Sequence, residues 1–298
     1  MKNITFLGPV GATFSHDAYN VLAEIYNAPK VVRGIAETNC KPASANGEIL
    51  GMITEHGGYG AIAMETLAEG RVTEPLESFI ELLQKFDNHS SSKKSCPFHI
   101  VGAVKMKLHF CLMVQSSNRT RVVKKIVAHA KSLGACKENI LRAGAETKTV
   151  NSNGEAARLI AEDPEYKNWA ALGPKSAAEK YGLEILNPAF EDSEAVTTFF
   201  LIAPKEELVR VGKNNRALIV CRLKHQSGSL VKALQALASE NLNLIQIHSV
   251  HIANHSYDFA IEIDVPENQI DGMAKAMKKF EGCVEKFLLF GPFEVLSR

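Results

Sequence analysis

Short apolar runs alternate with helix-spaced segments through the first two thirds of the chain, and this alternation restricts the possible folds more than any other feature. Strands separated by helices favour an α/β unit that binds ligands at the ends of its strands. The runs that we interpret as strands are "NITFL" (3–7), "VVRGI" (31–35), "YGAIAME" (59–65), "VGAVKMKLHFCLMV" (101–114, one or two strands), "WAALG" (169–173) and "TTFFLIAP" (197–204).

Helical spacing and capping signals lie between these runs. We expect a helix over 121–134 that buries Val122, Ile126, Val127 and Leu133, and a helix after Ser152, where the capping-box pattern begins. The strand at 197–204 comes so late that it can return to the first sheet. This predicts a unit over 1–203 with a middle lobe inserted at about 76–175, and therefore a cleft between two lobes.

The last part of the chain has a different pattern. Residues 216–298 read as strand, helix, strand, strand, helix and strand, which predicts a separate ferredoxin-like βαββαβ domain after a polar linker over 204–215. Leu230, Ala233, Leu234 and Leu237 form one apolar helix face. Domains of this kind more often bind a regulator or pair with a second copy than perform chemistry.

Charge and cysteine spacing exclude several classes of function. The net charge of +1 gives no electrostatic reason to expect nucleic acid or an anionic membrane as partner, so we expect a small molecule. The N-terminal apolar stretch is too short for a signal peptide and no run has the length of a membrane span, so we expect a cytoplasmic protein. The six cysteines are scattered, which predicts reduced thiols and no metal site.

The segment "GPVGATFSHDAY" (8–19) is the first candidate site. It leads from a strand into a helix, whose unpaired N–H groups and dipole attract an anion. Gly11 and the hydroxyls of Thr13 and Ser15 suit a carboxylate. The alternative is a capped helix start that binds no ligand.

These segments, in this order, resemble prephenate dehydratase followed by an ACT regulatory domain. The motifs are "GPVGATFSHDAY" (Gly-Pro-x-Gly-Thr-[FY]-[ST]), "AIAMETLAEGRV" (Pro-Ile-Glu-Asn-Ser-x-x-Gly-x-Val), "GPKSAAEKYGL" (Ala-Ala-x-x-Tyr-Gly-Leu), "AVTTFFLIAP" (Asn-x-Thr-Arg-Phe) and "GSLVKALQALASENLNLIQIHSVHI" (Gly-Ala-Leu to Glu-Ser-Arg-Pro). The resemblance covers nearly the whole chain. It implies a two-lobed, periplasmic-binding-protein-like catalytic unit and an ACT domain over 216–298.

Several polar motif positions differ from the family. Thr66 and Leu67 stand where it has Asn and Ser, and Thr198 stands where it has the arginine of Thr-Arg-Phe; moving the register by one residue supplies no arginine. The Ser-Thr-Ala segment reads Ser152, Asn153, Gly154, and the Ser-His-Pro segment reads Ala128, His129, Ala130. The Glu-Ser-Arg-Pro segment reads His248, Ser249, Val250, His251.

The resemblance implies prephenate as substrate, no cofactor or metal, and a homodimer or homotetramer. It assigns Thr197, Thr198 and Glu65 to catalysis, and Gly11, Thr13, Ser15, Thr66, Ser152, Asn153 and Phe199 to substrate binding. It also implies an amino-acid effector at Gly228, Ser229, Leu230, His248 and Ser249, although the altered motif argues against phenylalanine. In the family, the threonine donates to the leaving ring hydroxyl and the arginine holds an anion.

Three functions follow from this pattern. Without the arginine, loss of CO2 alone would give a non-aromatic dihydro product, as in the prephenate decarboxylases of antibiotic pathways; this is the reading that the sequence favours. A tolerant dehydratase of phenylalanine biosynthesis and a non-catalytic binding protein are the alternatives. Arg71, Lys175 or Arg142 could replace the missing charge. Glu65 could equally be an exposed carboxylate, Thr197 and Thr198 plain strand residues, and His109, His129, His248 and His251 core or surface residues.

Overall fold

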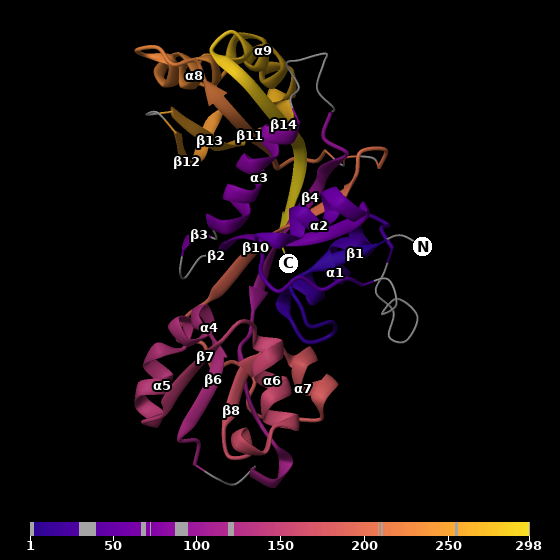
Figure 1. Ribbon diagram of the computed structural model, residues 1–298, viewed down its shortest axis with the longest axis vertical. Helices are drawn as coiled ribbons and strands as arrows, with labels where there is room; N and C mark the ends of the chain where they lie inside the picture. The colour runs from indigo at the N-terminus through magenta and orange to yellow at the C-terminus, as the bar shows by residue number, and fades with distance from the viewer. Residues whose placement is uncertain are drawn as a thin grey trace.

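The computed structural model describes residues 3–29, 40–66, 70–71, 73–86, 95–118, 122–207, 209, 211–253 and 256–297, which form three tiers along the long axis (Figure 1). A first lobe lies in the middle, a second lobe at one end and the C-terminal unit at the other. This is the two-lobed α/β architecture that the sequence predicts. The strand expected at 31–35 and most of the loop expected at 87–95 lie outside the described residues.

The first lobe contains one end of a long mixed sheet, in the order β1-β2-β10-β4, with β3 paired to β2. β1 runs parallel to β2, whereas β10 is antiparallel to both β2 and β4. The late strand therefore returns to the first sheet, as expected. The elements of this lobe are β1 (Ile4–Phe6), α1 (Phe14–Ile25), α2 (Glu48–His56), β2 (Tyr59–Thr66), β3 (Gly70–Arg71), α3 (Thr73–Lys85), β4 (Phe98–Leu108) and β10 (Ala195–Pro204).

The second lobe is inserted between β4 and β10 and has its own sheet, in the order β7-β6-β8-β5-β9. Its strands are β5 (Cys111–Val114), β6 (Lys125–His129), β7 (Glu146–Val150), β8 (Ala170–Gly173) and β9 (Glu184–Asn187). Its helices are η1 (Ser116–Asn118), α4 (Ala130–Ala135), α5 (Lys137–Ala143), α6 (Asn153–Glu162), η2 (Pro164–Tyr166) and α7 (Lys175–Tyr181).

Two expectations about this lobe are wrong. The lobe extends from β5 to β9 rather than over 76–175, because α3 and β4 belong to the first lobe and β4 pairs with β10 along its length. The helix expected over 121–134 is instead the strand β6 followed by the short helix α4, and Val122 is 74% exposed. A short apolar run such as Ile126 to Ala128, buried between β7 and β8, has no period that separates strand from helix.

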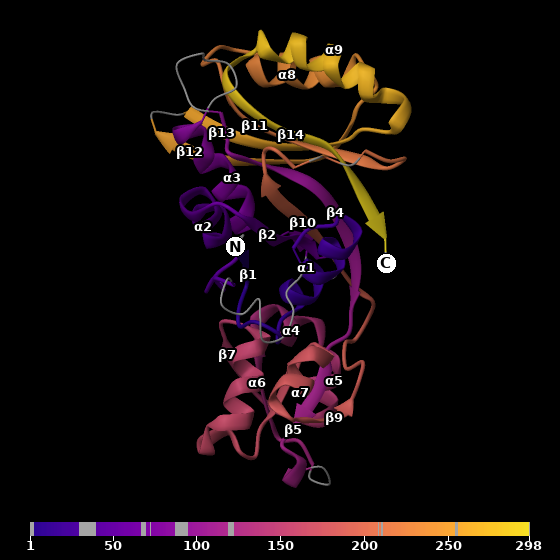
Figure 2. The same ribbon diagram turned by 90° about the vertical axis from the view of Figure 1, so that its right-hand side faces the viewer.

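The C-terminal unit has the predicted βαββαβ order. It comprises β11 (Asn215–Leu223), α8 (Ser229–Ala238), β12 (Asn243–Ala253), β13 (Ser256–Asp264), η3 (Glu267–Gln269), α9 (Ile270–Glu281) and β14 (Val284–Ser297). Helices α8 and α9 cover one face of its sheet (Figure 2).

The unit is nevertheless not separate from the first lobe. β14 continues past the βαββαβ fold and pairs in parallel with β4, so both units share one sheet. Figure 2 shows β14 descending from the sheet below α8 and α9 to lie beside β4. The face of the C-terminal sheet opposite to α8 and α9 packs against α3. There the ring of Phe290 lies 5.1 Å from that of Phe79 and 6.2 Å from that of Phe98.

Gly102 on β4 provides a test of the packing between α1 and the first sheet. A Cβ at this position would lie 1.9 Å from Cζ of Tyr26, the C-cap residue of α1. We expect Gly102→Ala to lower the free energy of unfolding by about 1–3 kcal/mol, because the ring must move out of a filled core. Urea denaturation measures this change.

Gly51→Ala is the matched control for this variant. Gly51 lies within α2 with nothing within 4 Å of a Cβ. The same substitution there should stabilise the protein by about 0.5–1 kcal/mol, because alanine restricts the unfolded chain and favours the helix. Equal stabilities of the two variants would contradict the contact between Tyr26 and Gly102.

Candidate functional site

A cleft of about 610 Å³ lies between the two lobes. Apolar side chains such as Phe14, Phe110 and Phe199 form much of its wall, and polar groups from both lobes converge on it. The polar lining residues are Thr13, Ser15, Ser44, Asn46, Thr66, Thr73, Glu74, His129, Lys131, Ser132, Thr149, Asn151, Ser152, Asn153 and Thr197.

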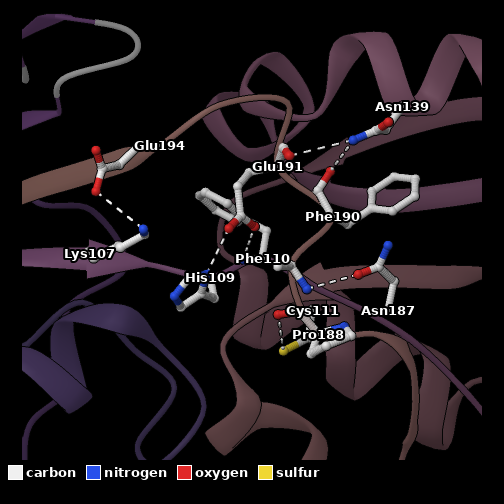
Figure 3. A network of polar contacts seen from close by, with 11 residues as sticks. Lys107, His109, Phe110, Cys111, Asn139, Asn187, Pro188, Phe190, Glu191 and Glu194 are labelled. Carbon is white, nitrogen blue, oxygen red and sulfur yellow. Dashed lines mark hydrogen bonds and ion pairs between the residues drawn. The ribbon is translucent and has the colours of Figure 1, made fainter.

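A network of polar contacts ties together the two connections between the lobes (Figure 3), and Phe110 within this network lines the cleft. Glu191 accepts hydrogen bonds from the backbone N–H of Phe110 at 2.9 Å and contacts Nδ1 of His109 at 2.7 Å. Asp192 accepts from the N–H groups of Glu138 and Asn139 at the start of α5. These contacts fix the entry to and the exit from the second lobe relative to each other.

The turn before α1 is built as an N-cap. The Thr13 hydroxyl donates to the carbonyl of Leu7 at 2.7 Å and accepts from the N–H of His16 at 3.2 Å. Its one hydrogen is therefore used within the protein, so the capping interpretation of Thr13 is the one that the structure supports. Ser15 lines the cleft from the first turn of α1, whereas Gly11 (φ +72°) lies outside the lining and near Lys180.

Two threonine hydroxyls meet on the floor of the cleft. Thr66 and Thr197 are register partners on β2 and β10, and their Oγ1 atoms lie 3.1 Å apart. Phe199, two residues further along β10, lies on the same face and also lines the cleft. The structure thus brings together three of the residues that the sequence analysis selected.

The structure does not bring Thr198 and Glu65 into the cleft. They are register partners as well, but adjacent strand residues point to opposite faces, so both lie behind the sheet. Thr198 is buried there, and a carboxylate oxygen of Glu65 lies 3.8 Å from the Arg216 guanidinium of the C-terminal unit. An arginine at position 198 would likewise face away from the cleft.

The second lobe contributes the start of α6. Ser152 caps this helix by accepting from the N–H of Glu155 at 3.1 Å. The side-chain carbonyl of Asn153 accepts from the N–H of His129 at 3.0 Å and from the hydroxyl of Ser132 at 2.9 Å. Ser152 and Asn153 both line the cleft. The hydroxyl of Ser152 is used to cap α6, however, and the side-chain carbonyl of Asn153 holds the loop before α4 in place.

Lys131 supplies a cation to the cleft from the first turn of α4. It forms no ion pair with any residue that the structure describes. Sequence reasoning missed it and named Arg71, Lys175 and Arg142 instead. Lys175 pairs with Glu179 and Arg142 bonds to Asn139, both outside the cleft, and the side chain of Arg71 lies outside the described part of the chain. The available signal was the position of Lys131 two residues after His129 in a family-like segment.

His129 is held as a neutral ring. Its Nδ1 accepts from the N–H of Lys131 at 3.3 Å, which leaves the proton on Nε2. Burial lowers the pKa of His129, the Lys131 charge lowers it further, and the Glu74 carboxylate partly opposes both effects. The ring is therefore an uncharged hydrogen-bond donor at neutral pH.

The predicted effector residues occupy two faces of the C-terminal sheet. Gly228, with φ +80°, precedes α8, and Ser229 and Leu230 begin that helix. His248 on β12 points to the other face, where its Nε2 lies 3.9 Å from a Glu77 oxygen on α3. Ser249 is exposed. Within one chain, the described contacts do not join the two groups.

Neither a metal site nor a membrane helix is found in the described ranges. No three His, Cys, Asp or Glu side chains there are grouped to hold a metal ion, and no helix there is long and apolar enough to span a bilayer. All six cysteines are free thiols.

The charges around His129 predict its titration. We expect its NMR midpoint to lie below 6.5, because protonation would place a second cation beside Lys131 in a buried site. Lys131→Met should raise the midpoint by removing repulsion, and Glu74→Gln should lower it by removing attraction. Shifts in the same direction for both variants, or a wild-type midpoint above 6.5, would contradict this arrangement.

Comparison with known proteins identifies the family of this chain. Residues 4–207 match the family model of prephenate dehydratase. The chain is 27% identical over 245 residues to the prephenate dehydratase of Methanocaldococcus jannaschii, a match that covers 82% of this chain and 84% of that protein. The family match extends over both lobes and the cleft.

Solved structures share the fold. A prephenate dehydratase from Arthrobacter aurescens in complex with L-Phe aligns with a TM-score of 0.76 at 22% identity, over 99% of this chain and 90% of that one. GqqA, a quorum quenching acylase, aligns with a TM-score of 0.72 at 20% identity, over 98% of each chain. Such identities show fold alone. The family match carries the assignment: the chain belongs to the prephenate dehydratase family.

Proposed function

We propose that this protein is a prephenate dehydratase that releases CO2 and water together and yields phenylpyruvate. The observation that carries the proposal is the Thr197 hydroxyl, which faces the cleft and contacts the Thr66 hydroxyl at 3.1 Å. When the bond between the ring and its carboxylate breaks, the electron pair moves through the ring and expels the ring hydroxyl. With one proton taken up, the hydroxyl leaves as water and the ring becomes aromatic.

The threonine pair suits the departing hydroxyl. If Thr66 donates to Thr197, the Thr197 hydrogen is free to point into the cleft toward the leaving oxygen. A donor placed where negative charge develops lowers the barrier of the step. The neighbouring Phe199 and Ala63 give the ring an apolar surface on which to lie.

Prephenate carries two carboxylates, and the cleft offers cationic character from both lobes. Lys131 lies on the second lobe, and Ser15 and the N-terminus of α1 lie on the first. Unpaired N–H groups and the helix dipole attract anions there. A substrate bound between the lobes would place negative charge near the Lys131 ammonium and near the N-terminus of α1 at the same time.

Side-chain direction weakens the case for the non-aromatising decarboxylase. That case depends on an arginine lost at position 198, but this position lies behind the sheet. The threonine proposed to assist water loss stays in the cleft. The product still distinguishes the two reactions, and it also separates both from a protein that only binds prephenate.

The first experiment incubates the purified protein with prephenate at neutral pH and follows product mass and ultraviolet spectrum against a no-enzyme control. Loss of CO2 and water with the phenylpyruvate spectrum supports the dehydratase. Loss of CO2 alone establishes the decarboxylase instead. Unchanged prephenate with retained binding shows a non-catalytic binding protein.

Two neighbouring threonines allow a matched test of the mechanism. Thr197→Val should reduce kcat about 10²–10³-fold, because it removes one donor at the leaving group without changing side-chain shape. Thr198→Val makes the same change one residue away, on the buried face behind the cleft. It should leave kcat within about twofold of wild type. Equal effects of the two substitutions would contradict the assignment of Thr197.

We further infer that the C-terminal unit is an ACT domain that pairs with a second copy and binds an aromatic amino acid. β12 ends the sheet, and Leu244, Ile247 and Tyr257 on β12 and β13 are 40–46% exposed. An uncovered edge strand with apolar side chains favours association. The L-Phe complex of the Arthrobacter protein makes phenylalanine the first ligand to try.

Light scattering tests the association, and calorimetric titration with phenylalanine and tyrosine tests the ligand. We expect a dimer or tetramer for wild type and a monomer for Ile247→Lys, which places a charge on the edge strand. An unchanged assembly state in the variant would exclude this edge as the interface. Absence of heat with either amino acid would exclude an aromatic effector.

A further inference from the structure

The first lobe and the C-terminal unit are joined by a buried arginine. Arg216 on β11 is 9% exposed, and its guanidinium lies 2.8 Å from Glu262, 3.8 Å from Asp264 and 3.8 Å from Glu65. Glu262 and Asp264 lie on β13 of the same unit, whereas Glu65 lies on β2 of the first lobe. One cation thus connects two units that the sequence analysis treats as separate.

We propose that Arg216 is a positioning residue for the cleft: by holding Glu65, it sets the strand segment that points the Thr66 hydroxyl at Thr197. The inference rests on the proposed function, because it concerns the same threonine pair. It makes the active site depend on docking of the C-terminal unit. Neither Arg216 nor Glu65 touches the cleft itself.

The backbone at this point needs such an anchor. The pairing of β10 with β2 skips one residue, because Thr198 pairs with Glu65 but Phe199 pairs with Ala63. A bulge of this kind interrupts the ladder and re-aims the side chains beside it. β2 ends at Thr66, and β3 pairs with Glu65 and Thr66 only. The direction of Thr66 is therefore set between the bulge on one side and the end of the strand on the other, where a contact to Glu65 adds a further constraint.

Arg216 is well placed to supply the missing constraint. Its shortest contact, at 2.8 Å, is to Glu262, which is only 4% exposed, so the guanidinium is held within its own unit. The same Nη1 atom that donates to Glu262 lies 3.8 Å from a Glu65 carboxylate oxygen, so the contact between the two units is an ion pair without a direct hydrogen bond. The cation is thus held by one unit and presented to the carboxylate of the other.

Position 198 supports the same interpretation. Thr198 is the register partner of Glu65, and both side chains lie behind the sheet. The family motif has an arginine at this position, where it would lie beside the same carboxylate. In this chain the side chain is a threonine, and the cation beside Glu65 comes from β11. An arginine introduced at 198 should therefore take over the contact when Arg216 is removed.

The experiment measures kcat and KM for prephenate in Arg216→Gln, Glu65→Gln and the double variant. Each single substitution should lower kcat about 10- to 100-fold, because a misplaced Thr66 hydroxyl no longer orients the Thr197 hydroxyl toward the leaving group. KM should change less than about threefold. The double variant should lose no more than either single one, because both break the same contact. Thr198→Arg should restore at least half of the lost activity to Arg216→Gln.

Arg222→Gln is the matched control. Arg222 lies on the same strand and makes two 2.7 Å bonds to the buried Asp258, within the C-terminal unit. Removing it weakens an equivalent ion pair without touching Glu65, so kcat should be unchanged. Glu65→Gln leaves the pair of Arg216 and Glu262 intact, which keeps a test available if Arg216→Gln does not fold.

Wild-type kcat in Arg216→Gln or Glu65→Gln, equal losses in Arg222→Gln, or additive losses in the double variant would overturn the proposal. Hydrogen exchange separates this failure from failure of the proposed function. Loss of the contact should speed exchange of the amides at 63–66 whether or not prephenate is turned over. If wild type leaves prephenate unchanged while exchange still responds, the positioning stands and only the assigned reaction fails.

Discussion

Pairing of β10 with both β2 and β4 is the interaction on which the rest of the structure depends. β10 returns from the second lobe and fills the space between two strands of the first lobe, so it closes the insertion and fixes the cleft. Because the strand is pleated, alternate side chains of β10 face opposite sides of the sheet. Thr197 and Phe199 face the cleft, while Thr198 and Phe200 face the C-terminal unit, where the Phe200 ring packs 4.9 Å from that of Phe293.

The polar groups that line the cleft are of two kinds: some are used in hydrogen bonds that build the site, and others are available to a ligand. Thr13, Ser152 and Asn153 use their side chains to cap helices and to hold the loop before α4. The N–H groups at the start of α1, the Lys131 ammonium and the Thr197 hydroxyl face the space that remains. Because the pKa of His129 is lowered, the ring is uncharged at neutral pH and can donate a hydrogen bond in this site without adding a charge. The positive charge that faces a dianionic substrate then comes from Lys131 and the N-terminus of α1.

The shared sheet gives the C-terminal unit a physical route to the cleft. β14 extends the first sheet, α3 lies under the C-terminal sheet with Thr73 and Glu74 at the cleft, and Arg216 reaches the residue beside Thr66. A ligand that shifts the C-terminal sheet would therefore act on the strand that carries the proposed donor pair. This coupling needs no large movement, because the contacts are already direct.

The sequence by itself determined the α/β class, the two-lobed unit, the βαββαβ unit and the family. These follow from local patterns: strand runs, capping residues such as Ser152 and motifs of contiguous residues. It also selected Thr66, Thr197 and Ser15, which line one cleft. It misread residues 121–134, because an apolar run buried between two strands carries no period.

Only the tertiary structure decided which side of the sheet each residue faces and which distant groups meet. A one-residue skip in β2 and the alternation of β10 place Thr197 in the cleft and Thr198 with Glu65 behind it, although the motif makes the two threonines look equivalent. The cation of the cleft, Lys131, and the cation behind it, Arg216, come from segments far from these strands in the sequence. Strand register and long-range packing bring them there, and neither leaves a local signature in the chain.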